Sequence, residues 1–153
     1  MENNKKKERY QRIYDQIDGL IIDKNYFIAN MATIVAVLNN KLDYFFWTGF
    51  YLLVNGELII GPYQGSVADI KLEKNKGVCW AGINRNKMVI VPDVEKFPGH
   101  IGCDSRSRSE IVVPLKNPDG NIIGVLDVDS KTLDQFDKID AKWLEKITEL
   151  LWK

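Results

Sequence analysis

The chain has 153 residues, 45% of them hydrophobic and 27% charged, with 21 basic and 21 acidic side chains. This length predicts a single domain, residues 1–153, and the composition excludes a disordered chain. The zero net charge argues against a nucleic-acid partner, because no basic excess is present to neutralise phosphates.

The N-terminus and the two cysteines indicate where in the cell the protein is expected. The N-terminus is polar, without the apolar segment of a secretory signal, and no apolar run reaches the roughly 20 residues that span a bilayer. We therefore expect a cytoplasmic protein with no membrane partner, in which Cys79 and Cys103 form no structural disulfide. The His100-x-x-Cys103 pair offers too few ligands for a closed zinc site, so we predict neither a metal nor a cofactor.

The first half of the chain predicts two helices, a hairpin and a loop. Apolar residues at steps of three and four predict helices over 10–21 and 27–38, and the short Lys5-Lys6-Lys7 run predicts a solvated start to the first. Aromatic and aliphatic runs predict strands over 44–54 and 57–60, joined by a hairpin turn at Asn55-Gly56. Weak periodicity over 61–87 predicts a loop that carries a short strand near 68–72 and a short helix near 78–85.

The second half of the chain predicts three strands and a final helix. The strands are expected over 88–91, 110–115 and 122–129, with a long irregular loop over 92–109 and an N-cap at Asp137 for the last helix. The order indicates an α+β fold, in which an antiparallel sheet carries the N- and C-terminal helices on one face. These amphipathic helices either cover the sheet of their own chain or pair two copies as a homodimer.

Acidic residues gather at the ends of two predicted strands. Alternation along 122–129 places Asp127 and Asp129 on one face, and pairing with 110–115 would bring Glu110 to the same end. Clustered carboxylates raise the pKa of at least one member, which then acts as a general acid near neutral pH while the others bind an ammonium group. The alternative is that both aspartates are strand-end turn residues.

A cysteine and two aromatic residues are the other candidates. Cys103 lies in a glycine- and charge-rich loop, which favours nucleophilic or redox sulfur chemistry, and a nearby Arg106 would raise its thiolate fraction. The alternatives are a cysteine that packs as a small core hydrophobe and an arginine that points to solvent. Trp47 and Tyr51 share one face of a predicted strand and form either the wall of a small-ligand pocket or ordinary core.

Several motifs together resemble the free methionine-(R)-sulfoxide reductases, which are single GAF domains. The segments are FFWTGFYLL (45–53), GPYQGSVADI (61–70), NKGVCWAGI (75–83), VPDVEKFPGHIGCDSRSRSEIVVPL (91–115) and IIGVLDVDS (122–130). The combination of the fourth and fifth segments is specific, since a generic GAF domain would not carry it. The resemblance covers nearly the whole chain.

This resemblance implies an activity and a set of roles. The substrate would be free methionine sulfoxide, whose sulfur a thiolate attacks to give a sulfenic acid and methionine; a disulfide then forms, which thioredoxin or another thiol reductant reduces. Cys103 would be the catalytic cysteine. The resemblance implies that Glu110, Asp127 and Asp129 hold the substrate and help protonate the sulfoxide oxygen, with Asp129 expected as the catalytic acid. It also implies that Trp47 and Tyr51 form a wall around the substrate methyl group.

The chain departs from the family pattern at the step after catalysis. Asp69 occupies the position of the first of three family cysteines, and Trp80 replaces a small glycine beside Cys79. Cys79 is therefore the protein thiol left to resolve Cys103, with an external thiol such as glutathione as the alternative. The rival functions are a non-catalytic GAF module that binds or senses a small ligand and a peroxide-sensing thiol protein.

Overall fold

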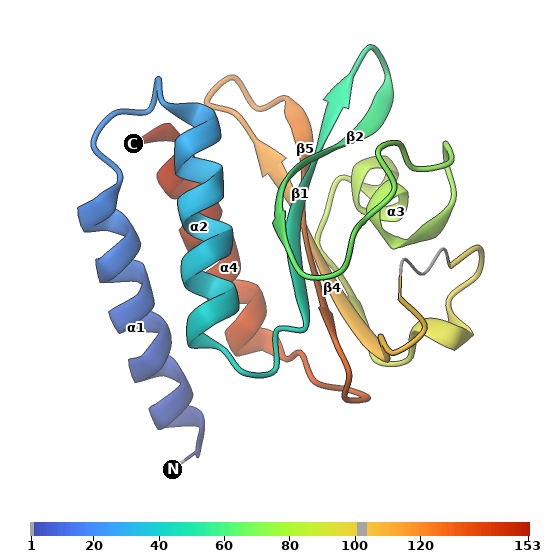
Figure 1. The fold of residues 1–153 in the computed structure, drawn as a ribbon, viewed down its shortest axis with the longest axis horizontal. Helices are drawn as coiled ribbons and strands as arrows, with labels where there is room; N and C mark the ends of the chain where they lie inside the picture. The colour runs from blue at the N-terminus through green and yellow to red at the C-terminus, as the bar shows by residue number, and fades with distance from the viewer. Residues whose placement is uncertain (1, 101–103) are drawn as a thin grey trace.

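The computed structural model describes residues 2–100 and 104–153, and Figure 1 shows how their helices and strands are arranged. The helices are α1 (Glu2–Leu20), α2 (Phe27–Lys41), α3 (Gly77–Arg85) and α4 (Lys138–Glu149), with single 3₁₀ turns at Val94–Lys96 and Leu150–Trp152. The strands are β1 (Trp47–Val54), β2 (Glu57–Gln64), β3 (Val89–Val91), β4 (Ser109–Lys116) and β5 (Ile122–Ser130).

The strands pair into one antiparallel sheet in the order β2-β1-β5-β4-β3. Asn55 and Gly56 join β1 to β2 with φ angles of 51° and 80°, the positive values that a type I′ hairpin turn requires at both positions. The hairpin predicted from this dipeptide is confirmed. β5 lies between β1 and β4, so its side chains have neighbours on both sides.

The two faces of the sheet carry different helices (Figure 1). α2 and α4 pack on one face with α1 outermost against them, and α3 packs on the other. Side chains such as Met31, Leu126 and Leu144 are fully buried between the sheet and the helices α2 and α4. The predicted α+β fold, with the terminal helices on one face, is confirmed. α4 covers the sheet of its own chain directly, and α1 lies over it on α2 and α4, while a homodimer stays a prediction.

Helix α1 begins at Glu2, well before the apolar residues that predicted it. The expectation of a solvated lysine run is wrong for Lys6, whose side chain is only 18% exposed and whose Nζ lies 2.7 Å from Asp140 Oδ2. Asp140 stands in the first turn of α4, where Asp137 is the N-cap, as predicted, and completes a capping box with it. A contact between distant parts of the chain thus draws Lys6 out of the solvent.

Two strand predictions need correction. The segment near 68–72 forms no strand; Lys71 makes a single bridge to Ile59. β1 begins at Trp47 rather than at position 44, because the residues before it turn out of α2. The loop between β2 and α3 and the loop before β4 both contribute side chains to the α3 face of the sheet.

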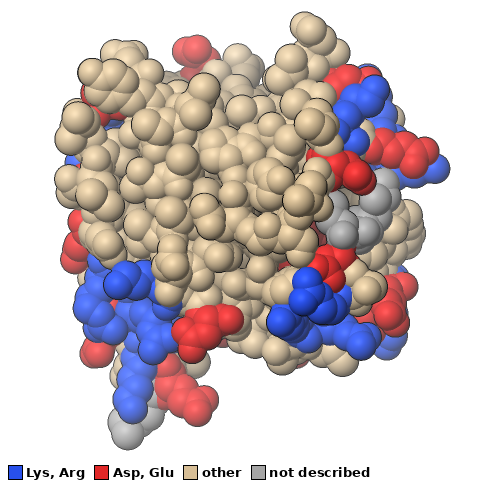
Figure 2. Space-filling view, viewed as in Figure 1, with Lys and Arg blue, Asp and Glu red and all other residues tan. Residues whose placement is uncertain are grey.

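The surface carries mixed charges. Figure 2 shows the basic side chains at the N-terminal end of α1 interspersed with acidic ones. No helix within residues 2–100 and 104–153 has both the length and the apolar character needed to cross a bilayer.

Candidate active site

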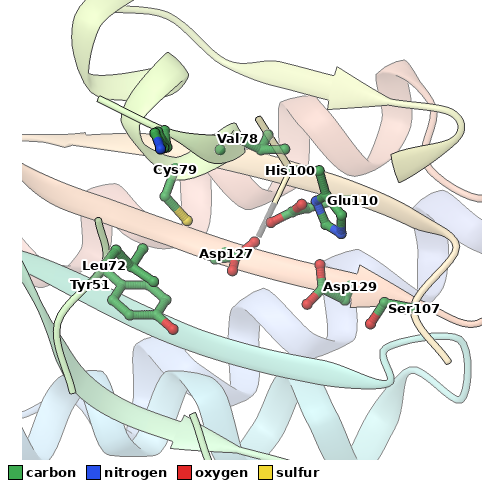
Figure 3. Close-up of a pocket in the computed structure, with 11 residues that line it drawn as sticks. Tyr51, Leu72, Val78, Cys79, His100, Ser107, Glu110, Asp127 and Asp129 are labelled. Carbon is green, nitrogen blue, oxygen red and sulfur yellow. The ribbon is translucent and has the colours of Figure 1, made fainter. Parts of the chain in front are cut away.

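Three acidic residues are brought together on the α3 face by strand register. Glu110 on β4 lies directly opposite Asp129 on β5, and Asp127 lies two residues before Asp129 on the same strand. Directly paired residues point to the same face, and so do residues two apart on a strand. The predicted grouping of the acids is therefore found, and Figure 3 shows the three carboxylates facing one pocket.

The carboxylates line a cavity of about 30 Å³. A cavity of this size admits one or two water-sized groups, so a larger ligand requires the surrounding loops to separate. The walls come from β1, β4, β5, α3 and the two loops above, and the lining residues are Tyr51, Leu72, Lys76, Gly77, Val78, Cys79, His100, Ser107, Glu110, Asp127 and Asp129.

Burial controls the protonation of the acids. Glu110 is 5% exposed and Asp127 6%. Burial raises the pKa of all three carboxyls, and the charge of neighbouring aspartates raises those of Glu110 and Asp129 further. Hydrogen bonds between Glu110 and the two aspartates raise the pKa of Glu110 further and partly lower those of Asp127 and Asp129. The cluster therefore favours at least one bound proton, which the hydrogen bonds between Glu110 and the two aspartates share among the three carboxyls.

One acceptor of this cluster is unsatisfied. Among the residues that the structure describes, none forms a hydrogen bond with Asp127 Oδ1, although this atom is buried. A buried acceptor without a donor is costly in free energy and is rare in folded proteins. Asp127 Oδ1 is therefore suited to receive a donor from a ligand.

The two predicted aromatic residues form one stack. Tyr51 lines the cavity, and Trp47 lies against it with ring centroids 5.9 Å apart. Trp47 also stacks on Tyr63 at 5.5 Å and donates its Nε1 hydrogen to the Ser66 carbonyl at 2.9 Å. A Cβ at Gly49 would lie 2.5 Å from the Trp47 ring, so this glycine makes room for the indole to lie along β1. Trp47 thus supports Tyr51 from behind.

Cys79 lies in the first turn of α3, with its thiol toward Asp127 (Figure 3). Burial, and then the charges of the acids, raise the pKa of this thiol, which donates a hydrogen bond to Asp127. The thiol is therefore neutral and a weak nucleophile until a base removes its proton. Trp80, beside it, is buried in the core, whereas Asp69 is exposed on the β2–α3 loop.

Cys103, the predicted nucleophile, lies in 101–103, outside the described residues. The residues after it are held to the β2–α3 loop: Asp104 Oδ2 accepts from Ser66 Oγ at 2.7 Å and pairs with Arg106 at 2.6 Å. Hydrogen bonds from Arg106 and Ser66 hold the pKa of Asp104 well below its usual range. Arg106 lies over the Phe46 ring, 4.8 Å from its centroid, so it anchors the loop instead of pointing only to solvent.

Several lining residues were not singled out by their sequence context. Leu72, Lys76 and Ser107 reach the cavity from loops, where no periodicity marks the residues that face a site. His100 was marked by being the only histidine, and it forms part of the wall; partial burial lowers its pKa.

Comparison with known proteins places this chain in a family. The family model described as GAF domain matches residues 31–153. A free methionine-R-sulfoxide reductase of Escherichia coli is 38% identical over 150 residues, which cover 97% of this chain and 89% of that protein. The chain belongs to the free methionine-R-sulfoxide reductase family of GAF domains.

Two further relatives are similar to this chain over most of its length. The family's enzyme from Neisseria meningitidis, solved in complex with its substrate, is 42% identical with a TM-score of 0.87, over 93% of this chain and 85% of that one. GAF domain-containing protein A of Dictyostelium discoideum is 50% identical over 147 residues, 95% of this chain and 92% of that protein. The Neisseria enzyme therefore shares the fold, and these three relatives match this chain over 93% of its length or more.

Proposed function

We propose that this protein reduces free methionine (R)-sulfoxide to methionine and that residues 1–153 act as one GAF domain. The observation that carries the proposal is the cluster of three carboxyls in one cavity, two of them buried and the third partly buried, with raised pKa values. Support comes from the 42% identity to an enzyme solved with its substrate. The geometry provides a proton donor, anionic acceptors and an aromatic wall, the three groups that a zwitterionic sulfoxide needs.

The substrate is proposed to lie with its polar groups on the acids. The sulfoxide oxygen accepts from Glu110, and the ammonium group donates to Asp127 Oδ1, the unsatisfied acceptor. The free N–H groups at the start of α3, together with Lys76, suit the α-carboxylate. Tyr51, backed by Trp47, faces the S-methyl group.

The reaction then moves one oxygen atom. The Cys103 thiolate attacks the sulfoxide sulfur, the oxygen takes the Glu110 proton, and the S–O bond breaks as the oxygen passes to Cys103 as a sulfenic acid. The cysteine sulfur is oxidised by two electrons and the methionine sulfur is reduced by two. Asp129, which accepts from Glu110, keeps the donor oriented, and solvent restores the proton.

Cys79 is the proposed resolving thiol. Asp127, its hydrogen-bond acceptor, takes the thiol proton, and the thiolate displaces water from the sulfenic acid to form the Cys79–Cys103 disulfide. The dithiol of thioredoxin supplies the two electrons and two protons that restore both cysteines. We place these steps in the cytoplasm, where thiols are kept reduced.

The proposed function is tested on racemic free methionine sulfoxide with dithiothreitol as reductant. We expect half of the substrate to be consumed, since one epimer fits, and Cys103→Ser to abolish the reaction. Chiral chromatography of the residual sulfoxide measures both. Absence of any methionine would contradict the proposal and favour the ligand-binding GAF module, whereas peroxide oxidation of Cys103 at a rate indifferent to the sulfoxide would favour the thiol sensor.

The resolving role of Cys79 has its own test. Cys79→Ser is expected to release one methionine per chain and then stop, because the sulfenic acid has no internal thiol to condense with. The measurement is methionine formed per chain with thioredoxin, thioredoxin reductase and NADPH. Full cycling by the variant would show instead that an external thiol resolves Cys103.

A further inference from the structure

The geometry points to a second ligand for this cavity: a thiophilic divalent cation, of which Zn²⁺ is the probe, bound by Cys79, Glu110 and Asp127. Nothing in the proposed reduction requires such an ion. The inference that the ion and the substrate exclude each other rests on the proposed function, whereas the binding of the ion does not.

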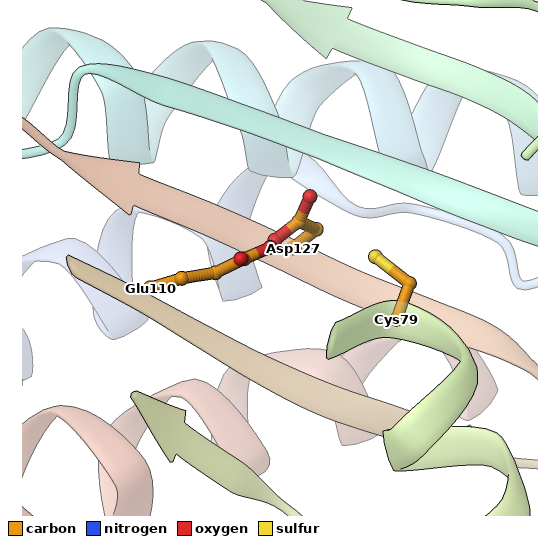
Figure 4. Close-up of side chains that lie close together, drawn as sticks. All are labelled: Cys79, Glu110 and Asp127. Atoms are coloured by element: carbon orange, nitrogen blue, oxygen red, sulfur yellow. The ribbon is translucent and has the colours of Figure 1, made fainter. Parts of the chain in front are cut away.

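Three elements converge to supply the ligand atoms. Cys79 comes from α3, Glu110 from β4 and Asp127 from β5, and Figure 4 shows the thiol and both carboxylates facing one another. One ligand atom from each residue lies within 4.8 Å of the other two. Zinc bonds of about 2.0–2.3 Å place neighbouring ligands of a tetrahedral site about 3.5 Å apart, so small side-chain rotations close the set.

An unpartnered atom marks the same place. Asp127 Oδ1 is buried in a residue that is 94% inaccessible, and no residue in 2–100 or 104–153 donates to it. The cavity of about 30 Å³ beside it admits an ion and a water molecule without movement of the loops. An ion coordinated there would satisfy the orphan acceptor.

The chemistry of the ligands selects the class of ion. A thiolate with two carboxylates suits Zn²⁺, whereas Mg²⁺ and Ca²⁺ prefer six or more oxygen ligands. On binding, the Cys79 thiol and the Glu110 carboxyl lose their protons to solvent, and sulfur–zinc and oxygen–zinc bonds replace them. Three protein ligands leave one position for water, so this is a reversible binding site and not the closed structural site that the sequence disfavours.

Occupation by zinc would block the proposed substrate. Glu110 could no longer donate a proton, and Asp127 Oδ1 could no longer accept from the ammonium group. Zinc and methionine sulfoxide therefore compete for the cavity, and a rise in free zinc would switch the protein off.

Binding is tested directly on the reduced full chain by competition with a chromophoric zinc chelator, without any turnover. We expect one Zn²⁺ per chain, and at least tenfold weaker binding by Cys79→Ser and by Asp127→Asn. Asp119→Asn, which removes an exposed carboxylate on the β4–β5 turn, is the matched control for Asp127→Asn and is expected to keep full affinity. Circular dichroism and thermal melting verify that each variant folds, and Cys79→Ala serves as the second sulfur-free variant.

Cobalt reports the ligand itself. Co²⁺ bound to the chain should show the near-ultraviolet absorption of a thiolate–cobalt bond, absent in Cys79→Ser and retained in Asp119→Asn. Unchanged zinc affinity of folded Cys79→Ser, or loss of binding in Asp119→Asn, would overturn the proposal.

Competition is measured on the Cys103→Ser chain, which binds sulfoxide without consuming it. Zinc is expected to weaken sulfoxide binding in proportion to its occupancy, and simultaneous binding of both ligands would overturn the exclusion. A chain that binds zinc at Cys79 but reduces no sulfoxide would defeat only the proposed reductase function. A chain that reduces sulfoxide but binds no zinc would defeat only this inference.

Discussion

Glu110→Gln is expected to lower the turnover of free methionine sulfoxide by about 10²-fold or more, the usual contribution of a general acid. The glutamine amide keeps the shape of the side chain and still donates to Asp127 and Asp129, but it has no proton to give. The loss should therefore fall on kcat, with KM changed little. Steady-state kinetics with dithiothreitol measure both quantities.

Asp129→Asn is the matched comparison. Asp129 accepts from Glu110 and acts through it, so this variant should slow turnover less than Glu110→Gln does. The opposite order would assign the proton to Asp129, as the resemblance first implied. Full activity of Glu110→Gln would remove that residue from proton transfer altogether.

Glu110→Gln should also stabilise the ligand-free protein at high pH. Burial raises the pKa of Glu110 above its usual 4.5, so the folded chain binds this proton more tightly than the unfolded chain. The free energy of unfolding therefore falls as pH rises through the pKa of Glu110 in the folded chain. Below pH ~4, under the pKa of this group in the unfolded chain, Glu110 is protonated in both states and causes no such loss. Thermal melting should show Glu110→Gln close to the unchanged chain in acid and more stable above neutral pH.

Asp140→Ala is expected to cost about 3–5 kcal/mol of stability, the typical effect of removing one partner of a buried ion pair. Asp140 is fully buried and accepts hydrogen bonds from Lys6 Nζ, from the hydroxyls of Tyr10 and Tyr44, and from the Asp137 amide. Its loss takes this acceptor from the fully buried Tyr10 hydroxyl, leaves Lys6 with the half-exposed Asp137 as its ion-pair partner, and removes half of the α4 capping box. The melting temperature should fall by about 10 °C for a domain of this size.

The exposed ion pair between Lys153 and Asp18 is the control. Its side chains are 48% and 42% exposed, and such pairs contribute about 0–1 kcal/mol. Asp18→Ala should therefore hardly change the denaturant midpoint. Equal losses for Asp18→Ala and Asp140→Ala would show that the buried network adds nothing beyond an ordinary surface pair.

Local patterns in the sequence were sufficient for much of the fold and the site. The Asn55-Gly56 turn and the Asp137 cap act within a few residues, so their structures follow from local geometry. Strict alternation along β5 placed Asp127 and Asp129 on one face, and pairing through the hairpin brought Glu110 beside them. The motifs supplied the family, which the comparisons confirm.

Tertiary structure decided the remaining features, because they depend on residues that meet from distant parts of the chain. No local sequence pattern predicts that the Lys6 side chain pairs with Asp140, or that the Cys79 thiol on α3 lies close to the Asp127 carboxylate on β5. The sequence could cluster three acids but could not show how deeply they are buried, and burial is what raises their pKa values. Sequence patterns thus determined the elements and the residue types of the site, while packing alone fixed their burial and their neighbours.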